Sequence, residues 1–316
     1  AADALALPGG YDNPPPVICY LDRGHGAAIR RERTRLPGGG ENPVAIIRVP
    51  RERMVSSGIG SSLVHEVGHQ AASLLDVIAS LRLVLRTRHE EDRAERAAWR
   101  YWERWISEIF ADFWSVARIG VASTLGLIGV MSLPRVFVFR LNPDDPHPVP
   151  WVRVKLSCAM GRALYPHPQW DRVERLWESF YPPTGLAPDY RALLAAFAST
   201  MPEFVDLLMT HRPASLRGRS LAEVMDTTAR TPARLGEHYR AWGTTMARLT
   251  RIPPSPAFAI IGQARADGRI TPEVESRTLV DLLYYWALRS TFDDATRASA
   301  RLVTGARAPR LEPSLN

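Results

Sequence analysis

The chain has 316 residues with a formal net charge of +7, and its composition is 46% hydrophobic and 23% charged. This length can bury a large core in one large domain or two smaller ones, and the composition argues against a disordered chain. All but one of the 40 lysine and arginine residues are arginine, the exception being Lys155. Such arginine richness is more typical of a GC-rich coding sequence than of a nucleic-acid-binding surface, so we expect no nucleic-acid partner.

The cysteines and the apolar segments indicate a soluble protein. Cys19 and Cys158 are too few and too far apart for a disulfide framework, and we expect two buried thiols. The longest apolar run, residues 119–133, has 15 residues, which favours a buried core helix over a span of about 20 residues. The first residues show no basic segment followed by a long apolar one. We therefore expect a cytoplasmic protein without a transmembrane segment.

The N-terminal part predicts an irregular arm and then a small sheet. Residues 1–16 are rich in Pro and Gly, which is typical of irregular structure. Residues 17–21 and 44–49 are short β-branched runs and predict two strands. The sheet either binds an extended peptide at its edge or only covers the helix that follows. His25 is a lone loop histidine, expected to be exposed to solvent rather than to bind a metal.

A metal-binding motif follows the predicted sheet. The sequence HEVGH, beginning at His65, has the form H-E-x-x-H. Because residues four apart lie on one face of a helix, His65 and His69 can offer two imidazole nitrogens to one zinc ion, with Glu66 beside its open side. Glu66 is then the general base for a zinc-activated water. Gly68 costs a helix up to about 1 kcal/mol relative to Ala, which indicates that another element approaches closely there.

A second helix, predicted for residues 94–118, supplies a third ligand. Glu108 and Asp112 are four residues apart, and their surroundings are apolar, where two unpaired carboxylates are costly to bury. A zinc ion explains both residues. Glu108 is then the third ligand, and Asp112 accepts a hydrogen bond from the far nitrogen of a zinc-bound histidine. The alternative is a partly exposed helix with ordinary acidic residues.

These motifs, together with a third, resemble a known group. HExxH is followed by EIFAD at residues 108–112, and then by His147-Pro148 with Arg153 six residues beyond the histidine. This pattern is similar to that of gluzincin zinc metallopeptidases, in particular the soluble core of the HtpX and CaaX-prenyl-protease type. The resemblance covers about residues 40–160. It implies a zincin-like core, bound zinc and a peptide or protein substrate, although the transmembrane helices of the integral members are missing here.

The third motif adds candidates for the remaining roles. In such families a histidine or tyrosine near the zinc helps to hold the reacting oxyanion, a role that His147 would fill here. His147 alternatively only anchors the loop before the next helix, and Tyr165 and His167 are further candidates for the oxyanion role. Arg153 either pairs with a carboxylate of the site or faces solvent. Metzincins need Gly and His where this chain has Ala72 and Leu75, so that class is excluded.

The fold class expected from these patterns is mainly α (α+β). It combines a zincin-like metallopeptidase core, a small N-terminal β-sheet and a helical C-terminal half. The catalytic region is residues 1–165, and residues 166–316 form a helical region packed on it. One expected helix, capped by Ser61 or Ser62, runs to about residue 88. The later expected helices are residues 154–164, 170–180, 190–209, 221–226, 232–249, 257–266 and 274–290, with His211 and His238 as isolated structural residues.

The expected function is that of a zinc-dependent metallohydrolase, in particular a peptidase. The alternative is a catalytically inactive, zinc-stabilised scaffold or binding protein. Glu66 favours the enzyme, because a purely structural site does not need a carboxylate beside two histidines. A nucleic-acid-associated regulator is a third hypothesis, but the arginine-rich residues 30–35 are too short and loop-like to support it.

Overall fold

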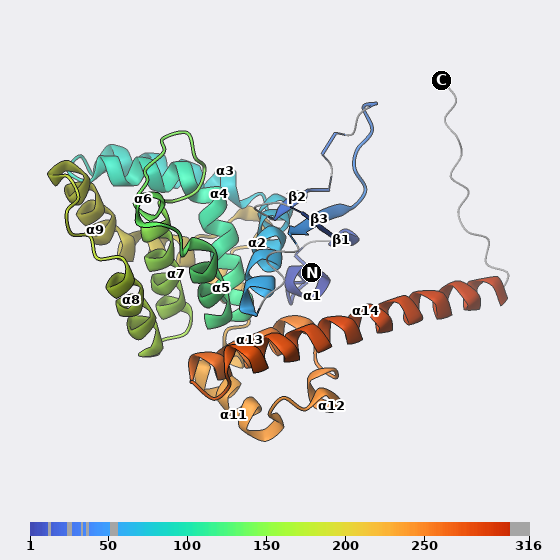
Figure 1. The fold of residues 1–316 in the computed structure, drawn as a ribbon. Coiled ribbons are helices and arrows are strands. Elements are labelled where there is room, and N and C mark those ends of the chain that lie inside the picture. The colour runs from blue at the N-terminus through green and yellow to red at the C-terminus, as the bar shows by residue number, and fades with distance from the viewer. Residues whose placement is uncertain (12–13, 24–26, 33, 36–37, 51–55, 304–316) are drawn as a thin grey trace.

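A computed structural model describes the chain in six stretches: residues 1–11, 14–23, 27–32, 34–35, 38–50 and 56–303. Within these stretches the protein is mostly helical, with one small sheet near the N-terminus (Figure 1). The expected mainly helical class with a small N-terminal sheet is therefore confirmed. His25, the expected exposed histidine, lies outside the described residues, as does Arg33 of the arginine-rich stretch.

The small sheet lies beside α2 (Ser57–Leu74) and consists of β1 (Val17–Asp22), β2 (Ala28–Arg30) and β3 (Ala45–Pro50). β3 is central, parallel to β1 and antiparallel to β2. Alternate residues of β3 are buried, because successive side chains of a strand point to opposite faces. The two expected strands are confirmed. β2 was not expected, because its three residues include only one β-branched side chain.

Helices make up most of the remaining chain. Besides α2, they are α1 (Ala2–Leu5), α3 (Val77–Glu91), α4 (Arg96–Ile119), α5 (Val121–Met131), α6 (Arg135–Val138), α7 (Pro150–Leu164), α8 (Gln169–Phe180), α9 (Pro188–Thr210), α10 (Leu221–Val224), α11 (Pro232–Trp242), α12 (Met246–Leu249), α13 (Pro254–Ala266) and α14 (Pro272–Val303), with short 3-10 turns at Ala214–Leu216 and Thr228–Arg230. The far end of α14 extends beyond the rest of the molecule (Figure 1).

Helices α2 and α4 pack against each other at Gly68. A Cβ atom on Gly68 would lie 2.7 Å from Ala111 Cα and 3.0 Å from Trp114 Cβ. Real Cβ atoms avoid such distances, so only glycine allows the two helix backbones to approach this closely. The close approach expected from Gly68 is confirmed, and it brings the HEVGH turn of α2 against the EIFAD turn of α4.

The start of α2 differs from the expectation. The helix begins at Ser57, one turn before the predicted caps Ser61 and Ser62. Ser61 is instead buried within the helix and donates a hydrogen bond to the carbonyl oxygen of Ser123, at 3.0 Å. Local sequence favours serine at a cap, but a contact with α5 places this serine inside the helix.

Two of the predicted helices are interrupted. The helix expected to continue to about residue 88 stops after α2, and α3 follows a residue in left-handed conformation, Asp76, with φ of 47°. Residues 232–249 likewise divide into α11 and α12 around Gly243, which has φ of 56°. Glycine at the end of a helix is a recognisable signal, whereas Asp76 gives none. Residues 2–5 also form α1 within the arm that was expected to be irregular.

The two cysteines differ in exposure. Cys158 on α7 is buried, as expected, but Cys19 on β1 is exposed and the expectation for it was wrong. β1 is an edge strand in which every residue after Val17 is exposed. The apolar composition of the strand therefore does not imply that its side chains are covered.

The core contains aromatic side chains from both predicted regions. Trp102 of α4 stacks on Phe204 of α9 with ring centroids 4.8 Å apart. Its indole nitrogen donates a hydrogen bond to Thr200 Oγ1, at 2.9 Å. One hydrophobic cluster extends through residues on both sides of residue 165. The helical region after residue 165 therefore packs directly on the helix that carries Glu108.

One of the described helices, α9, is long and apolar enough to cross a bilayer, judged by its length and composition alone. Core helices of soluble proteins have the same composition. In this structure one face of α9, with Phe197, Phe204 and Leu208, is buried in the protein core. The absence of a transmembrane segment and the cytoplasmic location stay predictions.

Candidate metal centre

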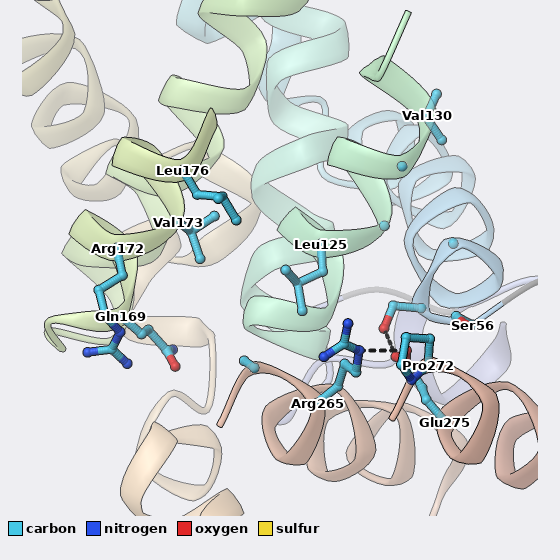
Figure 2. Close-up of a pocket in the computed structure, with 15 residues that line it drawn as sticks. Ser56, Leu125, Val130, Gln169, Arg172, Val173, Leu176, Arg265, Pro272 and Glu275 are labelled. Carbon is cyan, nitrogen blue, oxygen red and sulfur yellow. Dashed lines mark hydrogen bonds and ion pairs between the residues drawn. The ribbon is translucent and has the colours of Figure 1, made fainter. Parts of the chain in front are cut away.

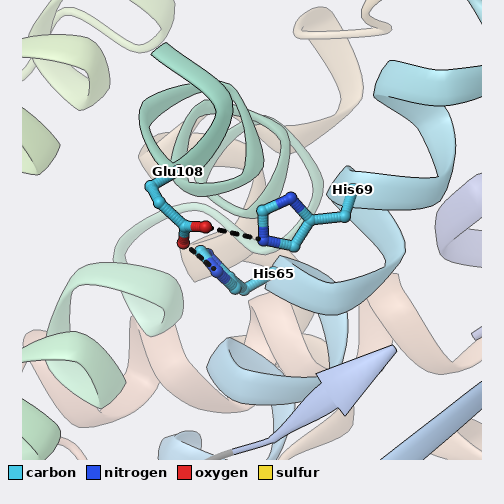
Figure 3. A group of neighbouring side chains, drawn as sticks. All are labelled: His65, His69 and Glu108. Carbon is cyan, nitrogen blue, oxygen red and sulfur yellow. Dashed lines mark hydrogen bonds and ion pairs between the residues drawn. The ribbon is translucent and has the colours of Figure 1, made fainter. Parts of the chain in front are cut away.

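Two histidines of α2 and one glutamate of α4 meet in the structure (Figure 3). Glu108 Oε2 lies 3.2 Å from His65 Nε2, and Glu108 Oε1 lies 3.5 Å from His69 Nε2. All three potential ligand atoms lie within 4.8 Å of one another. The i, i+4 spacing of the histidines and the close contact at Gly68 together produce this arrangement.

The donor set fits a zinc ion. Zinc prefers imidazole nitrogen and carboxylate oxygen at about 2.0–2.2 Å in tetrahedral geometry, which places neighbouring ligand atoms about 3.3–3.5 Å apart. Each histidine lies close to that separation from one Glu108 oxygen, His65 from Oε2 and His69 from Oε1, whereas the full set of ligand atoms is spread over up to 4.8 Å. A bound ion would therefore need a small contraction of the cluster. The three side chains are each only 12–13% exposed, so a bound ion would lie largely out of bulk solvent.

Asp112 and Arg153 hold His65 in position. His65 Nδ1 is 2.8 Å from Asp112 Oδ1, an arrangement that directs Nε2 toward Glu108. Arg153 of α7 in turn donates two hydrogen bonds to the Asp112 carboxylate, from Nε at 2.6 Å and from Nη2 at 2.9 Å. Arg153 is 7% exposed, so it pairs with a carboxylate of the site rather than facing solvent. Supporting contacts of this kind fix the orientation of metal-binding histidines.

His147 reaches the same cluster from the loop before α7. Its Nε2 lies 3.1 Å from Glu108 Oε2, and its Nδ1 lies 2.8 Å from Asp145 Oδ1. Asp145 also accepts a hydrogen bond from the backbone N–H of His147, at 2.9 Å. The side chain is 45% exposed, which leaves it open to a bound molecule. His147 therefore borders the cluster, held in orientation by Asp145.

Glu66 faces the pocket at the cluster and is 7% exposed. Burial raises the pKa of its carboxyl group above the ordinary value, and His65 and His69 oppose this increase. A carboxylate in such surroundings is a stronger base than one in water.

The ionisation of the cluster follows from its contacts. Burial opposes charge on Glu108, but hydrogen bonds from His147, His65 and His69 hold its pKa well below the ordinary value. Burial likewise opposes charge on Asp112, whose pKa Arg153 and His65 hold low. Burial would lower the pKa of His65, but Asp112 and Glu108 raise it to about 9. The two acids are therefore anionic at neutral pH, and His65 holds a proton in this arrangement. A metal ion bound to His65 Nε2 would displace that proton.

A pocket of about 370 Å³ opens onto the cluster. Besides His65, Glu66, His69, Glu108 and His147, it is lined by Ala27, Ile29, Arg31 and Ser107. Sequence patterns marked none of these four residues, nor Asp145, as part of the site; Arg31 stood out only as a member of the arginine-rich residues 30–35. Ser107 precedes the predicted ligand Glu108, and Asp145 lies two residues before His147. Closeness in sequence to a motif was therefore the only feature that could have predicted these two residues. No signal marked the residues around β2, because β2 itself was not expected.

A larger cavity among the described residues shares no lining residue with this pocket. It measures about 620 Å³ and lies between α5 and α8, with α13 and α14 at its base (Figure 2). Leu125 and Leu176 contribute to its apolar wall, and Arg265 pairs with Glu275 at 4.0 Å. Size alone therefore does not identify the site, since the predicted ligands all border the smaller pocket.

Tyr165, His167, His211 and His238 lie away from the cluster. The Tyr165 hydroxyl is buried and donates to the carbonyl oxygen of Ala117, at 2.6 Å. His167 lines a different pocket, beside α11 and α13. Neither residue borders the pocket that contains Glu66, so the structure brings neither of them to the candidate site. His211 contacts Ser80 Oγ at 2.8 Å, and His238 packs on Trp242, consistent with structural roles.

No protein-family model matches the sequence, and no curated protein or solved structure is significantly similar to the chain.

Proposed function

We propose that this protein is a zinc-dependent metallohydrolase with a zincin-like core, and that it hydrolyses peptide bonds. The observation that carries the proposal is the pocket shared by Glu66 and the three potential ligands His65, His69 and Glu108. A buried carboxylate beside a zinc-type donor set is the combination that hydrolysis of an amide requires.

Each residue has a defined task in this proposal. His65, His69 and Glu108 would hold the zinc ion, which when bound lowers the pKa of a water ligand to about 7 and polarises a carbonyl group. Glu66 accepts a proton from the attacking water and delivers it to the leaving amine. Asp145 orients His147 through Nδ1, and Nε2 of the same ring, which contacts Glu108 here, would turn to donate a hydrogen bond to the carbonyl oxygen as negative charge develops on it.

Asp112 and Arg153 act through His65 and do not touch the substrate. Arg153 fixes the carboxylate of Asp112 at two points, and Asp112 fixes the ring of His65. This chain of contacts connects the third sequence motif to the first. Arg153, on α7 after the His147 loop, thus reaches the cluster through Asp112.

The competing proposal is a zinc-stabilised scaffold without activity. Structural zinc sites usually have four protein ligands, whereas the cluster identified among the described residues has three. Glu66 also faces an open pocket, and a scaffold has no use for a base there. Both observations favour the enzyme.

The experiment compares wild type with Glu66→Gln on a mixed peptide library, after zinc has been measured in both proteins by elemental analysis. We expect equal zinc content, cleavage by wild type and loss of at least about 100-fold in rate for Glu66→Gln, the usual contribution of a general base. Zinc-loaded wild type that cleaves nothing would support the scaffold. Full activity of Glu66→Gln would remove Glu66 from the mechanism.

A second comparison tests the ligands. Glu108→Ala should lose zinc, whereas Glu103→Ala on the same helix should keep it, because Glu103 pairs with Arg86 at 2.6 Å. Full zinc occupancy in Glu108→Ala would show that the third ligand lies elsewhere.

A further inference from the structure

One side of the pocket is formed by β2 and the residues next to it. Ala27, Ile29 and Arg31 line the pocket, and the intervening residues Ala28 and Arg30 do not. Side chains of an extended chain alternate between two faces, so every second residue points toward the cluster. Arg31 is thereby placed at the border of the same pocket as Glu66, while its neighbour Arg30 points away.

The backbone at Arg31 is held by three hydrogen bonds. Its carbonyl oxygen accepts from Thr34 Oγ1 at 2.8 Å and from Asn42 Nδ2 at 3.1 Å. The next backbone N–H, that of Glu32, donates to Gln70 Oε1 at 3.1 Å. Gln70 is 2% exposed and directly follows His69 on α2. The position of Arg31 is therefore tied to the helix that carries two of the potential zinc ligands.

Arg31 is exposed, and its guanidinium group has no hydrogen bond or ion pair with the residues that the structure describes. The two carboxylates of the pocket are both engaged: Glu108 contacts three histidines, and Glu66 is buried beside His65 and His69. The pocket thus presents a positive charge at its border without a negative partner of its own. An arginine so placed suits a planar carboxylate, which it can bind through two parallel hydrogen bonds.

We propose that Arg31 selects substrates with a carboxylate close to the bond that is cleaved. The carboxylate belongs either to an acidic side chain or to the free C-terminus of a peptide. This inference rests on the proposed peptidase function for its kinetic consequences, but the recognition of the carboxylate does not require turnover. Because Arg31 is exposed, an ion pair with it corresponds to about a fivefold change in affinity, the upper end for surface pairs.

Binding of labelled peptides to the full chain tests the proposal without catalysis. The Glu66→Gln protein is used, with and without zinc, so that no peptide is consumed. The peptides are variants of one parent sequence. Each variant carries Glu, Gln or Lys at one position, the position is varied along the peptide, and each variant is made with both a free C-terminal acid and a C-terminal amide. We expect at least one Glu or free-acid peptide to bind about fivefold more tightly than its Gln or amide counterpart.

Three variants assign the preference. Arg31→Gln should abolish it, Arg31→Lys should keep part of it because the charge stays, and Arg30→Gln should leave it unchanged. Arg30 is the matched control, since it is an exposed arginine directly before Arg31, at the end of β2, and does not line the pocket. A preference absent from the parent protein, or one retained in full by Arg31→Gln, would overturn the inference. Weaker binding of the peptide amide than of the free acid identifies the C-terminus as the source of the carboxylate. Weaker binding of the peptide with Gln than of the one with Glu identifies a side chain.

Cleavage assays separate this inference from the proposed function. If the wild-type protein cleaves acidic and neutral peptides equally well, or if Arg31→Gln still cleaves the acidic peptides preferentially, the role of Arg31 fails and the hydrolase stands. If wild type cleaves nothing but binds carboxylate peptides through Arg31, the hydrolase fails and the carboxylate site stands.

Discussion

Gly68→Ala probes the contact that brings the two motif helices together. The added Cβ would lie 2.7 Å from Ala111 Cα, about 0.8 Å inside the roughly 3.5 Å at which carbon atoms make favourable contact. The atom that it meets belongs to a backbone and cannot rotate away, so α2 and α4 must separate. Overpacking costs about 1–3 kcal/mol, and alanine returns up to about 1 kcal/mol in helix propensity. With that return subtracted, we expect a net loss of up to about 2 kcal/mol.

Urea unfolding, followed by the tryptophans of α4, measures this change as a lower midpoint at constant slope. Gly129→Ala is the control, since Gly129 lies inside α5 with no atom within 4 Å of its added Cβ. That variant should gain up to about 1 kcal/mol. Gly68→Ala should also bind zinc about tenfold more weakly, because separating the helices moves the histidines away from Glu108. Gain of stability at Gly68 with unchanged zinc affinity would refute the reasoning.

Two further predictions concern buried groups. Arg153→Ala should destabilise the protein by about 3 kcal/mol in urea unfolding, because Asp112 would be left buried with only a histidine partner. Arg162→Ala, which removes an exposed ion pair, should cost less than about 1 kcal/mol. Equal costs would contradict the buried pairing of Arg153 with Asp112. A thiol reagent should modify the exposed Cys19 in the folded protein and the buried Cys158 only on unfolding. Burial raises the pKa of both thiols, so the difference comes from access of the reagent. Rapid modification of both would show that α7 is not packed as described.

The spacing of residues within one helix was enough to predict which side chains share a face. His65 with His69, and Glu108 with Asp112, needed only the helical period. The resemblance to a known motif order then suggested that the two pairs face each other, and the distances agree with that arrangement. The zincin-like identity of the fold and the role of zinc stay proposals.

The site features that sequence patterns did not predict depend on contacts between side chains and backbone that no local pattern encodes. Arg31 borders the pocket only because β2 pairs with β3 and Gln70 holds the adjacent backbone. Asp145 orients His147 through a tight turn whose shape no periodic pattern encodes. The burial of Arg153 also depended on tertiary structure, because an arginine in a helix faces solvent unless a carboxylate lies within reach.

The same limit explains the errors. Cys19 lies in an apolar run that predicts a strand correctly, but the run does not tell whether another layer covers the strand. Ser61 is a good cap by residue type, and its place inside α2 is set by a hydrogen bond to α5. Composition and period fix the type of an element, whereas exposure and boundaries follow from its neighbours.

The most direct test of the account is a crystal of the zinc-loaded protein measured at the zinc absorption edge. We predict one anomalous difference peak among His65, His69 and Glu108, about 2.0–2.2 Å from a ligand atom of each. A peak at other residues, or none at these three in a protein that contains one equivalent of zinc, would contradict the central claim.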